Sequence, residues 1–260
     1  MKQRLETVIT FRHGRFPLNE RARLTGSAAL EAIARGIPAD ADATFDLLPE
    51  GCEQAQQLQR VLASFAIDTC LTSPTRRTQT TADIALGDHE TSPMIYSVDS
   101  LQERSRGIFS YAPDEWAQQH PNYSLGKESV LHWQPFGFDH NNRPGESIAA
   151  VAKTRVPSAL GDAFRLAPDG TVALSTHGEY MLALRALLLD LNDEQCRAPI
   201  VEDPPENIRA LQCAKWIGHG QIDIFHGVEL TPDGWRAEEF RAIGTEPGFE
   251  FDTNNYTLAV

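Results

Sequence analysis

Two short apolar segments that each end in a His-Gly pair constrain the fold of this chain most strongly. Thr7-Val-Ile-Thr-Phe11 runs into Arg12-His13-Gly14, and Val172-Ala-Leu-Ser-Thr176 runs into His177-Gly178. Short runs of β-branched and apolar residues are typical of buried strands. In open α/β sheets, ligands bind at the edge where the parallel strands end. The two segments therefore predict a pair of strands that bring two histidines to one edge of a sheet.

The residues around these turns suit an anionic ligand. Arg12 stands next to the first histidine, and Gly14 has no Cβ, so a bulky ligand can approach the backbone. The second His-Gly pair leads into the apolar run Met181–Leu189, which is long enough for a buried helix. Backbone N–H groups at the N-terminus of such a helix favour an anion.

A third segment of the same kind adds two arginines. Ile67–Leu71 is strand-like, and Thr72–Ala82 follows with Arg76 and Arg77 in a predicted first helical turn. By chemistry alone, either guanidinium could serve an anion site.

Four sequence blocks together resemble the histidine phosphatase superfamily, in its phosphoglycerate-mutase-like branch. They occur in the family's order and are Arg12-His13-Gly14, Ser73-Pro-x-x-Arg77-x-x-x-Thr81-Ala82, Leu101-x-Glu103-Arg104-x-x-Gly107 and Ser175-x-His177-Gly178. Each block is weak alone, whereas the four in order are highly specific, and the match spans roughly residues 7 to 190. Weaker matches are Asn19, Thr25 and Gly26, which fall where the family places phosphate-pocket residues, and the segments Leu48–Ala55 and Arg143–Ser147.

The resemblance implies an α/β fold, a three-layer α/β/α sandwich with a mostly parallel central sheet. We expect a single domain over residues 1–260, with insertions at about 27–46 and 106–145 and a strand-rich C-terminal extension at 206–260. In relatives, the second insertion covers the active site as a lid. The patterns predict strands at about 6–11, 67–71, 94–98, 171–175, 211–217, 222–230 and 235–243, and helices at 49–66, 76–86, 146–164 and 180–190.

The composition limits which partners the protein could bind and in which cellular compartment it could work. The 260 residues carry a formal net charge of −13 and show no basic run, which argues against nucleic acid as a partner. No apolar run approaches the ~20 residues that span a bilayer, and no signal-peptide core is visible, so we expect a cytoplasmic protein without a membrane partner. The four cysteines have no metal-site spacing.

The resemblance also implies the chemistry. His13 is the candidate nucleophile, Arg12 and Arg77 would bind phosphate oxygens, and His177 would donate to one of them. Glu103 would serve as general acid and then as general base. Spacing from Ser73 selects Arg77, which leaves Arg76 facing solvent. Asn19, Thr25, Gly26, Arg104 and Gly178 would complete the substrate site, with no metal and no cofactor.

Several features of the sequence depart from the family or stay open. Glu179 stands where relatives often have a small residue; it could repel an anionic substrate group, bind a cationic one, or complement the helix dipole. His89, His120, His132, His140, His219 and His226 form no metal motif, so surface or lid positions are expected for them.

The favoured activity is a metal-independent phosphomonoesterase that acts through a phosphohistidine on a small phosphorylated metabolite. The 74 positions between Glu103 and His177 are closer to the phosphatases of the family than to its mutases. The alternatives are a phosphoglycerate-mutase-type phosphotransferase and a catalytically silent phosphate-binding protein. A homodimer is left open.

Overall fold

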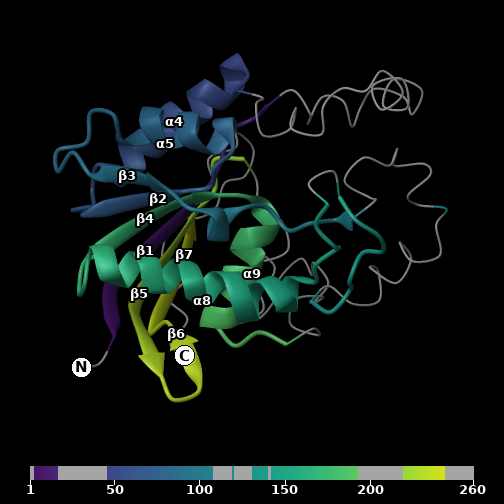
Figure 1. Ribbon diagram of the computed structural model, residues 1–260. Coiled ribbons are helices and arrows are strands. Elements are labelled where there is room, and N and C mark those ends of the chain that lie inside the picture. Colours follow the sequence, from purple (N-terminus) through teal and green to yellow (C-terminus); the bar gives the residue numbers. More distant parts are fainter. Residues whose placement is uncertain are drawn as a thin grey trace, which may run out of the picture.

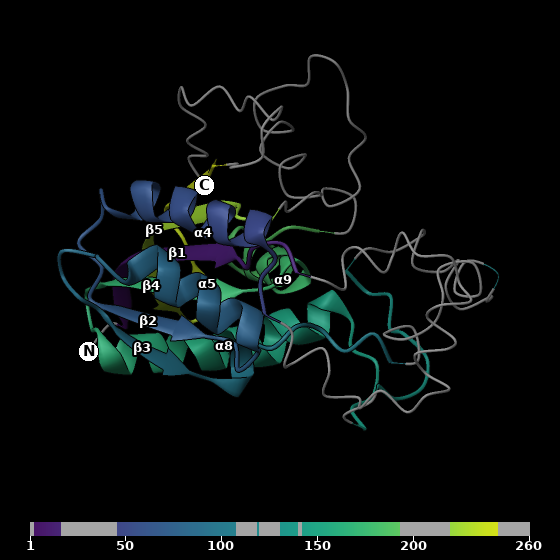
Figure 2. The same ribbon diagram turned by 90° about the horizontal axis from the view of Figure 1, so that it is seen from above.

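The computed structural model describes residues 3–16, 46–107, 119, 131–139, 142–192 and 219–243. A central sheet lies between two layers of helices, with α4 and α5 on one face and α8 and α9 on the other (Figure 1). The order of the strands along the path of the sheet is β3-β2-β4-β1-β5-β6, and β7 pairs with β5. Figure 2 shows the first five of these strands in that order. The predicted three-layer sandwich is therefore confirmed.

Four parallel strands form the part of the sheet that carries the His-Gly turns predicted above, and three antiparallel strands extend it. The parallel strands are β1 (Arg4–Arg12), β2 (Thr69–Thr72), β3 (Met94–Ser97) and β4 (Thr171–Thr176). The antiparallel strands are β5 (Ile222–Thr231), β6 (Gly234–Arg236) and β7 (Glu239–Ile243).

The helices begin where the sequence provides start signals. Proline at the first position of α4 needs no backbone hydrogen-bond partner there, and the Ser147 hydroxyl accepts a hydrogen bond from the N–H of Ala150 at the start of α8. The helices are α4 (Pro49–Leu62), α5 (Arg76–Leu86), the 3₁₀ turn η1 (Asp99–Leu101), α8 (Ile148–Leu166) and α9 (Gly178–Leu188). Among the described residues, no helix is both long and apolar enough to cross a membrane.

The core consists of two apolar clusters, one on each face of the sheet. Side chains alternate along β1, so Val8 joins the cluster under α8 and α9, whereas Ile9 joins the one under α4 and α5. In β4, Leu174 and Ala173 divide in the same way. Burial on both faces explains why these strands read as continuous apolar runs rather than as alternating ones.

The tail departs from the prediction of one strand at 235–243. β6 pairs with the far end of β5, and β7 pairs with its first half. Between them, the N–H of Ala237 donates to the carbonyl of Leu188 in α9, and Gly227 in β5 adopts a φ of +61°. Because the backbone leaves the ladder to cap α9, the predicted strand is split in two.

Other helix and strand boundaries differ from the predicted ones by a few residues. Some predicted elements lie outside the described residues. The predicted helix at 49–66 ends at Leu62, where the N–H groups of Ser64 and Phe65 turn back to Val61 and Leu62. The strand at 211–217, the insertion at about 27–46 except for its last residue, and most of the lid segment are not among the described residues. The single-domain assignment stays a prediction.

Candidate active site

Neighbouring parallel strands deliver the predicted residues to one edge of the sheet. Arg12 of β1 lies beside Thr176 of β4 in register, and the next residue, His13, donates its N–H to the carbonyl of Thr176 at 3.0 Å. Ser73 follows β2 and donates its N–H to Ser175 at 3.0 Å. The register therefore places the turns after β1, β2 and β4 side by side, as expected for a site at the ends of parallel strands.

His13 is held in one tautomer, with one ring nitrogen free of a proton. The side chain is 2% exposed, and its Nδ1 lies 2.8 Å from the carbonyl oxygen of Gly14. Since a carbonyl can only accept, Nδ1 carries the proton and Nε2 keeps its lone pair. Burial, followed by the charge of Arg77, lowers the pKa of His13 well below its usual value. A buried neutral imidazole with an available Nε2 can act as a nucleophile.

Arg77 links the two histidines that end the strands. It is the second residue of α5, and its Nε lies 3.3 Å from Nε2 of His13 while its Nη2 lies 3.3 Å from Nδ1 of His177. The guanidinium also lies over the ring of Phe16, 4.3 Å from the ring centroid. Arg76, by contrast, is exposed and pairs with Asp46 at 3.1 Å. Arg77, which the spacing from Ser73 indicated, therefore contacts both histidines, whereas Arg76 is exposed.

His177 is fully buried and tied to Ser73. Its Nε2 lies 2.9 Å from the Ser73 hydroxyl, and the centroids of the His13 and His177 rings are 5.1 Å apart. Burial, followed by the charges of Arg77 and Arg12, lowers the pKa of His177 well below its usual value. A hydroxyl can donate or accept, so Ser73 is compatible with a proton on either ring nitrogen.

Arg12 lies against Gly178, the first residue of α9. A Cβ at Gly178 would stand 3.4 Å from Nε of Arg12, an ordinary van der Waals contact. The guanidinium therefore lies beside the N-terminus of α9. Two arginines, two neutral imidazoles and a helix N-terminus thus surround one small region, a combination suited to a phosphate group.

Glu103 reaches this region because the 3₁₀ turn before it is tied to β4. The Thr176 hydroxyl donates to the carbonyl of Leu101 at 2.8 Å. Arg155 of α8 donates to the carbonyl of Gln102 at 2.7 Å and fixes the same loop from the other side. Burial, followed by the negative charge of Glu179, raises the pKa of Glu103. A carboxyl group that holds its proton to higher pH is suited to act as a general acid.

The side chain of Arg104 pairs with Glu179, the residue after Gly178. This Arg104 side chain is 3% exposed and forms a two-point salt bridge with Glu179, at 2.7 Å and 3.2 Å. Asn19, Thr25 and Gly26 lie outside the described residues. Of the predicted site residues that are described, Arg12, His13, Arg77, His177 and Gly178 come together, with Glu103 beside them.

The structure adds His219, which the sequence analysis expected at the surface or in the lid. Its ring centroid lies 5.6 Å from that of His13. The N–H of Gly220 donates to the carbonyl of Arg12 at 3.3 Å, and the N–H of Arg12 donates to Gln221 at 3.0 Å. Burial, followed by the charges of Arg12, Arg15 and Arg77, lowers the pKa of His219 to about 3.

A signal for His219 existed in the sequence. His219-Gly220 is a further His-Gly pair, and it directly precedes the predicted strand at 222–230. Because β5 runs antiparallel to β1, its beginning meets the end of β1 at the same edge. His219 precedes its strand, whereas the other candidate residues follow theirs, so the pattern of strands that end in His-Gly does not include it.

The remaining described histidines lie elsewhere. His89 is buried with Nε2 3.1 Å from the carbonyl of Leu62, and His132 is exposed. His226 bonds to the Thr7 hydroxyl at 3.0 Å, at the other end of the strands. His120 and His140 are outside the described residues. Within the described ranges, no group of three or more His, Cys, Asp or Glu side chains could hold a metal ion.

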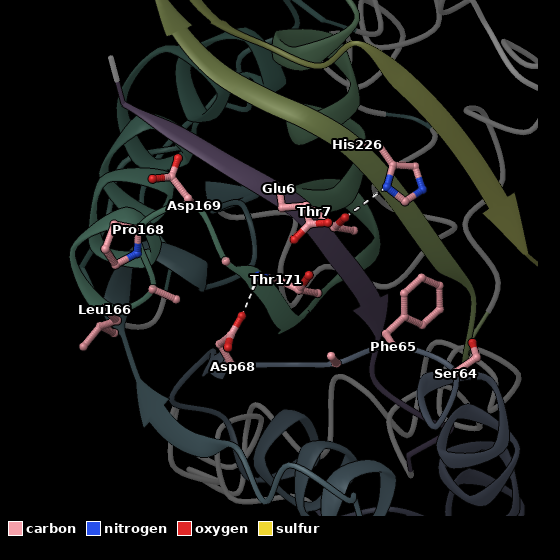
Figure 3. Close-up of a pocket in the computed structure, with 13 residues that line it drawn as sticks. Glu6, Thr7, Ser64, Phe65, Asp68, Leu166, Pro168, Asp169, Thr171 and His226 are labelled. Atoms are coloured by element: carbon pink, nitrogen blue, oxygen red, sulfur yellow. Dashed lines mark hydrogen bonds between the residues drawn. The ribbon is translucent and has the colours of Figure 1, made fainter. Parts of the chain in front are cut away.

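An open pocket of about 880 Å³ lies at the opposite edge of the sheet, where β1 and β4 begin (Figure 3). Its acidic lining residues are Glu6, Asp68 and Asp169, and none of the 13 described residues that line it is Lys or Arg. The Asp68 carboxylate accepts the N–H of Thr171 at 2.8 Å, as Figure 3 shows. Its described lining therefore lacks the guanidinium and ammonium groups that usually bind phosphate, and its three carboxylates would repel an anion.

The chain belongs to the histidine phosphatase superfamily (branch 1), whose sequence profile matches residues 8–213. A curated relative from Arabidopsis thaliana, named "Probable 2-carboxy-D-arabinitol-1-phosphatase", is 26% identical over 129 residues. That alignment covers 45% of this chain and 24% of the relative, so the chain spans about a quarter of the relative's length.

Solved structures share the fold. A mycobacterial glucosyl-3-phosphoglycerate phosphatase complexed with VO₃ is 20% identical, with a TM-score of 0.62, over 93% of this chain and 99% of that one. A phosphoserine phosphatase mutant from Entamoeba histolytica, complexed with phosphoserine, is 19% identical, with a TM-score of 0.55, over 86% and 95% of the two chains. The resemblance found in the sequence is confirmed at the level of family and fold.

Proposed function

We propose that this protein is a metal-independent phosphomonoesterase that forms a phosphohistidine at Nε2 of His13. The observation that carries the proposal is the state of His13: its Nδ1 proton is held by the Gly14 carbonyl, and its Nε2 lone pair faces Arg77. Family membership and the phosphatase names of the relatives support the same activity.

The first step transfers the phosphoryl group to the protein. Nε2 of His13 attacks phosphorus, the bond from phosphorus to the ester oxygen breaks, and Glu103 gives its proton to that oxygen. The leaving group departs as an alcohol, and Glu103 is left as a carboxylate. The raised pKa of Glu103 supports this role, because the carboxyl must be protonated when the reaction begins.

The second step returns the protein to its initial state. Glu103, now a carboxylate, takes a proton from a water molecule while the water oxygen attacks phosphorus. The nitrogen–phosphorus bond breaks, inorganic phosphate forms, and His13 regains its lone pair. Splitting hydrolysis into two displacements of this kind is the general advantage of a nucleophilic residue.

The surrounding cations stabilise the charge on the transferred group. Arg12 and Arg77 present planar sets of N–H donors that match phosphate oxygens, and phosphate would take the Arg77 donors that now face the two histidines. The Ser73 hydroxyl can donate to Nε2 of His177, which lets the opposite nitrogen donate to a phosphate oxygen. His219 adds a third neutral imidazole to the pocket. Positioning and charge stabilisation of this kind supply most of the catalysis in phosphoryl transfer.

A hydrolysis assay with a generic substrate tests the proposal. We expect the wild-type protein to hydrolyse p-nitrophenyl phosphate in the presence of EDTA, and His13→Ala to lose activity by far more than tenfold. A loss of less than tenfold in a folded His13→Ala protein would refute His13 as nucleophile. Activity confined to 3-phosphoglycerate primed by its bisphosphate would indicate a mutase instead, and binding of phosphate without turnover would indicate a silent binding protein.

We further propose that the substrate is a small phosphorylated metabolite and that the protein works in the cytoplasm as a monomer or homodimer, without nucleic-acid or membrane partners. The names of the relatives support the substrate class, and the free thiols of Cys52 and Cys70 support a reducing compartment. Cell fractionation and size-exclusion chromatography test the location and the oligomeric state.

A further inference from the structure

Glu179 lies at the rim of the phosphate region and is bound by arginines from another segment. It is the second residue of α9, directly after Gly178. Its two carboxylate oxygens accept from Nη2 and Nε of Arg104 at 2.7 Å and 3.2 Å, and Nε of Arg106 lies 3.6 Å from one of them. A two-point pairing of arginine with carboxylate fixes the orientation of both groups as well as their charge.

The pairing leaves Arg104 with little to offer a substrate. Besides the two bonds to Glu179, its Nη1 donates to the carbonyl of Glu146 at 3.0 Å, and the guanidinium lies over the ring of Trp133 at 5.1 Å. The side chain is 3% exposed. A substrate group could bind Arg104 only by displacing Glu179.

The location gives this pairing a consequence for substrate choice. Arg104 directly follows Glu103, the proposed donor to the leaving oxygen, and its backbone N–H donates to Oε1 of Glu103 at 3.0 Å. This loop, with Arg104 and Arg106, therefore lies on the leaving-group side of the site. Burial alone would raise the pKa of Glu179, but the charges of Arg104 and Arg106 outweigh it and lower the pKa to about 2. Glu179 therefore remains ionised, and its charge offsets theirs on that side.

Complementing the helix dipole does not by itself account for the geometry. Glu50 occupies the equivalent second position of α4 and is exposed. A carboxylate at that position suffices for the dipole, whereas Glu179 is additionally clamped by a buried arginine from a distant loop.

We propose that Glu179 sets the charge preference of the leaving-group side: by holding Arg104 and Arg106, it favours phosphomonoesters whose leaving group carries no negative charge. Esters whose leaving group carries a carboxylate are therefore poorer substrates. This inference rests on the proposed phosphomonoesterase activity.

A matched pair of aryl esters tests the inference. Phenyl phosphate and 4-carboxyphenyl phosphate differ only by the carboxylate, and kcat/KM is measured for both. We expect the wild-type protein to prefer phenyl phosphate. In Glu179→Gln, which keeps the shape and removes the charge, the ratio should shift by about tenfold toward the carboxylate ester, because an uncompensated cation several ångströms from a carboxylate is worth at least that factor in a partly buried site.

Two further variants serve as controls. Glu179→Asp keeps the charge and should retain most of the wild-type preference. Glu6→Gln removes one exposed negative charge at the opposite edge of the sheet and should leave the ratio unchanged. Thermal unfolding of each variant confirms that the folded protein is being compared.

The outcomes separate this inference from the proposed function. Hydrolysis of phenyl phosphate by the wild type in EDTA, with the same ester ratio in Glu179→Gln, would overturn the inference alone. Absence of hydrolysis of either ester by the wild type would overturn the proposed function. If Glu179→Gln does not fold, the ester preference of the wild-type protein tests the inference. A wild-type preference for the carboxylate ester would contradict the role assigned to Glu179, and a preference for phenyl phosphate would support it.

Discussion

The three imidazoles of the site are kept neutral by their surroundings. Burial is the first cause in each case, and the charges of nearby arginines add to it, so the pKa values of His13, His177 and His219 are all lowered. A positive charge on any of them would face Arg12 or Arg77 in a region with little water. The same arginines that would bind phosphate therefore keep His13, the proposed nucleophile, in its neutral form.

The pH dependence of kcat/KM should follow from the opposite shifts of His13 and Glu103 in the free protein. The lowered pKa of His13 moves the acidic limb well below pH 6.5, and the raised pKa of Glu103 moves the alkaline limb above pH 4.5. We expect wild-type kcat/KM to persist below pH 6.5 and to fall as Glu103 ionises. Glu103→Gln, measured over the same pH range, should lose about 10²–10⁴-fold in kcat/KM and also lose the alkaline limb. An alkaline limb that survives this substitution would assign the acid to another residue.

The same imidazoles should make the folded protein sensitive to acid. The unfolded chain protonates its histidines near pH 6.5, whereas the folded protein does so only at lower pH. Below pH 6.5 the unfolded state therefore binds more protons than the folded state. The free energy of unfolding consequently decreases as the pH is lowered. Urea unfolding at pH 7 and pH 5 should show this loss, and His177→Asn should reduce the difference between the two pH values. An equal difference in wild type and variant would contradict the assignment.

At the level of elements, a buried ion pair joins α9 to β5. Nε and Nη2 of Arg185 each lie 2.6 Å from an oxygen of Asp223, and both side chains are fully buried. Gln221 donates to the same carboxylate at 3.2 Å. Since Gln221 also accepts the backbone N–H of Arg12, the pair helps fix the start of β5, where His219 lies, against the end of β1.

Removing one partner of this pair should destabilise the protein strongly. Asp223→Ala would leave the guanidinium of Arg185 buried without its carboxylate, and such a loss costs about 3–5 kcal/mol. The matched control is Asp233→Ala, whose exposed contact with Arg236 spans 3.9 Å and contributes about 0–1 kcal/mol. Urea unfolding of the three proteins measures the difference. Equal midpoints for the two variants would show that the buried pair contributes no more than the exposed one.

Sequence patterns predicted the elements whose own residues carry the signal, such as an apolar run or a helix start after a strand. β1 and β4 read as apolar runs because helices cover both faces of the sheet, and α5 begins at Arg76 as its position after a strand suggested. The split between β6 and β7 depends on the N–H of Ala237 reaching Leu188 in α9, a contact that no local pattern contains. The Glu179–Arg104 pair likewise depends on loop packing that no local pattern contains. His219 did leave a local signal, its His-Gly pair, but its place in the site follows from the antiparallel direction of β5.

For the whole molecule, the acidic surface opposes the local charge of the site. The chain has a formal net charge of −13, with 36 acidic and 23 basic residues, while Arg12 and Arg77 make the pocket itself attractive to an anion. The two fields act over different ranges. At about 0.01 M ionic strength the screening length is about 30 Å, comparable to a small domain, whereas at about 0.1 M it is about 10 Å.

A phosphomonoester should therefore bind more readily when the long-range field is screened. Raising sodium chloride from about 0.01 M to 0.1 M removes most of the repulsion from distant carboxylates but leaves the contacts within the pocket. We expect KM for p-nitrophenyl phosphate to fall while kcat stays nearly constant, because chemistry occurs after the substrate has passed through the screened field. Steady-state kinetics at fixed pH measure both constants. A rise in KM over this range would mean that the arginines, rather than the net charge, dominate the approach of the substrate, since screening would then weaken an attraction.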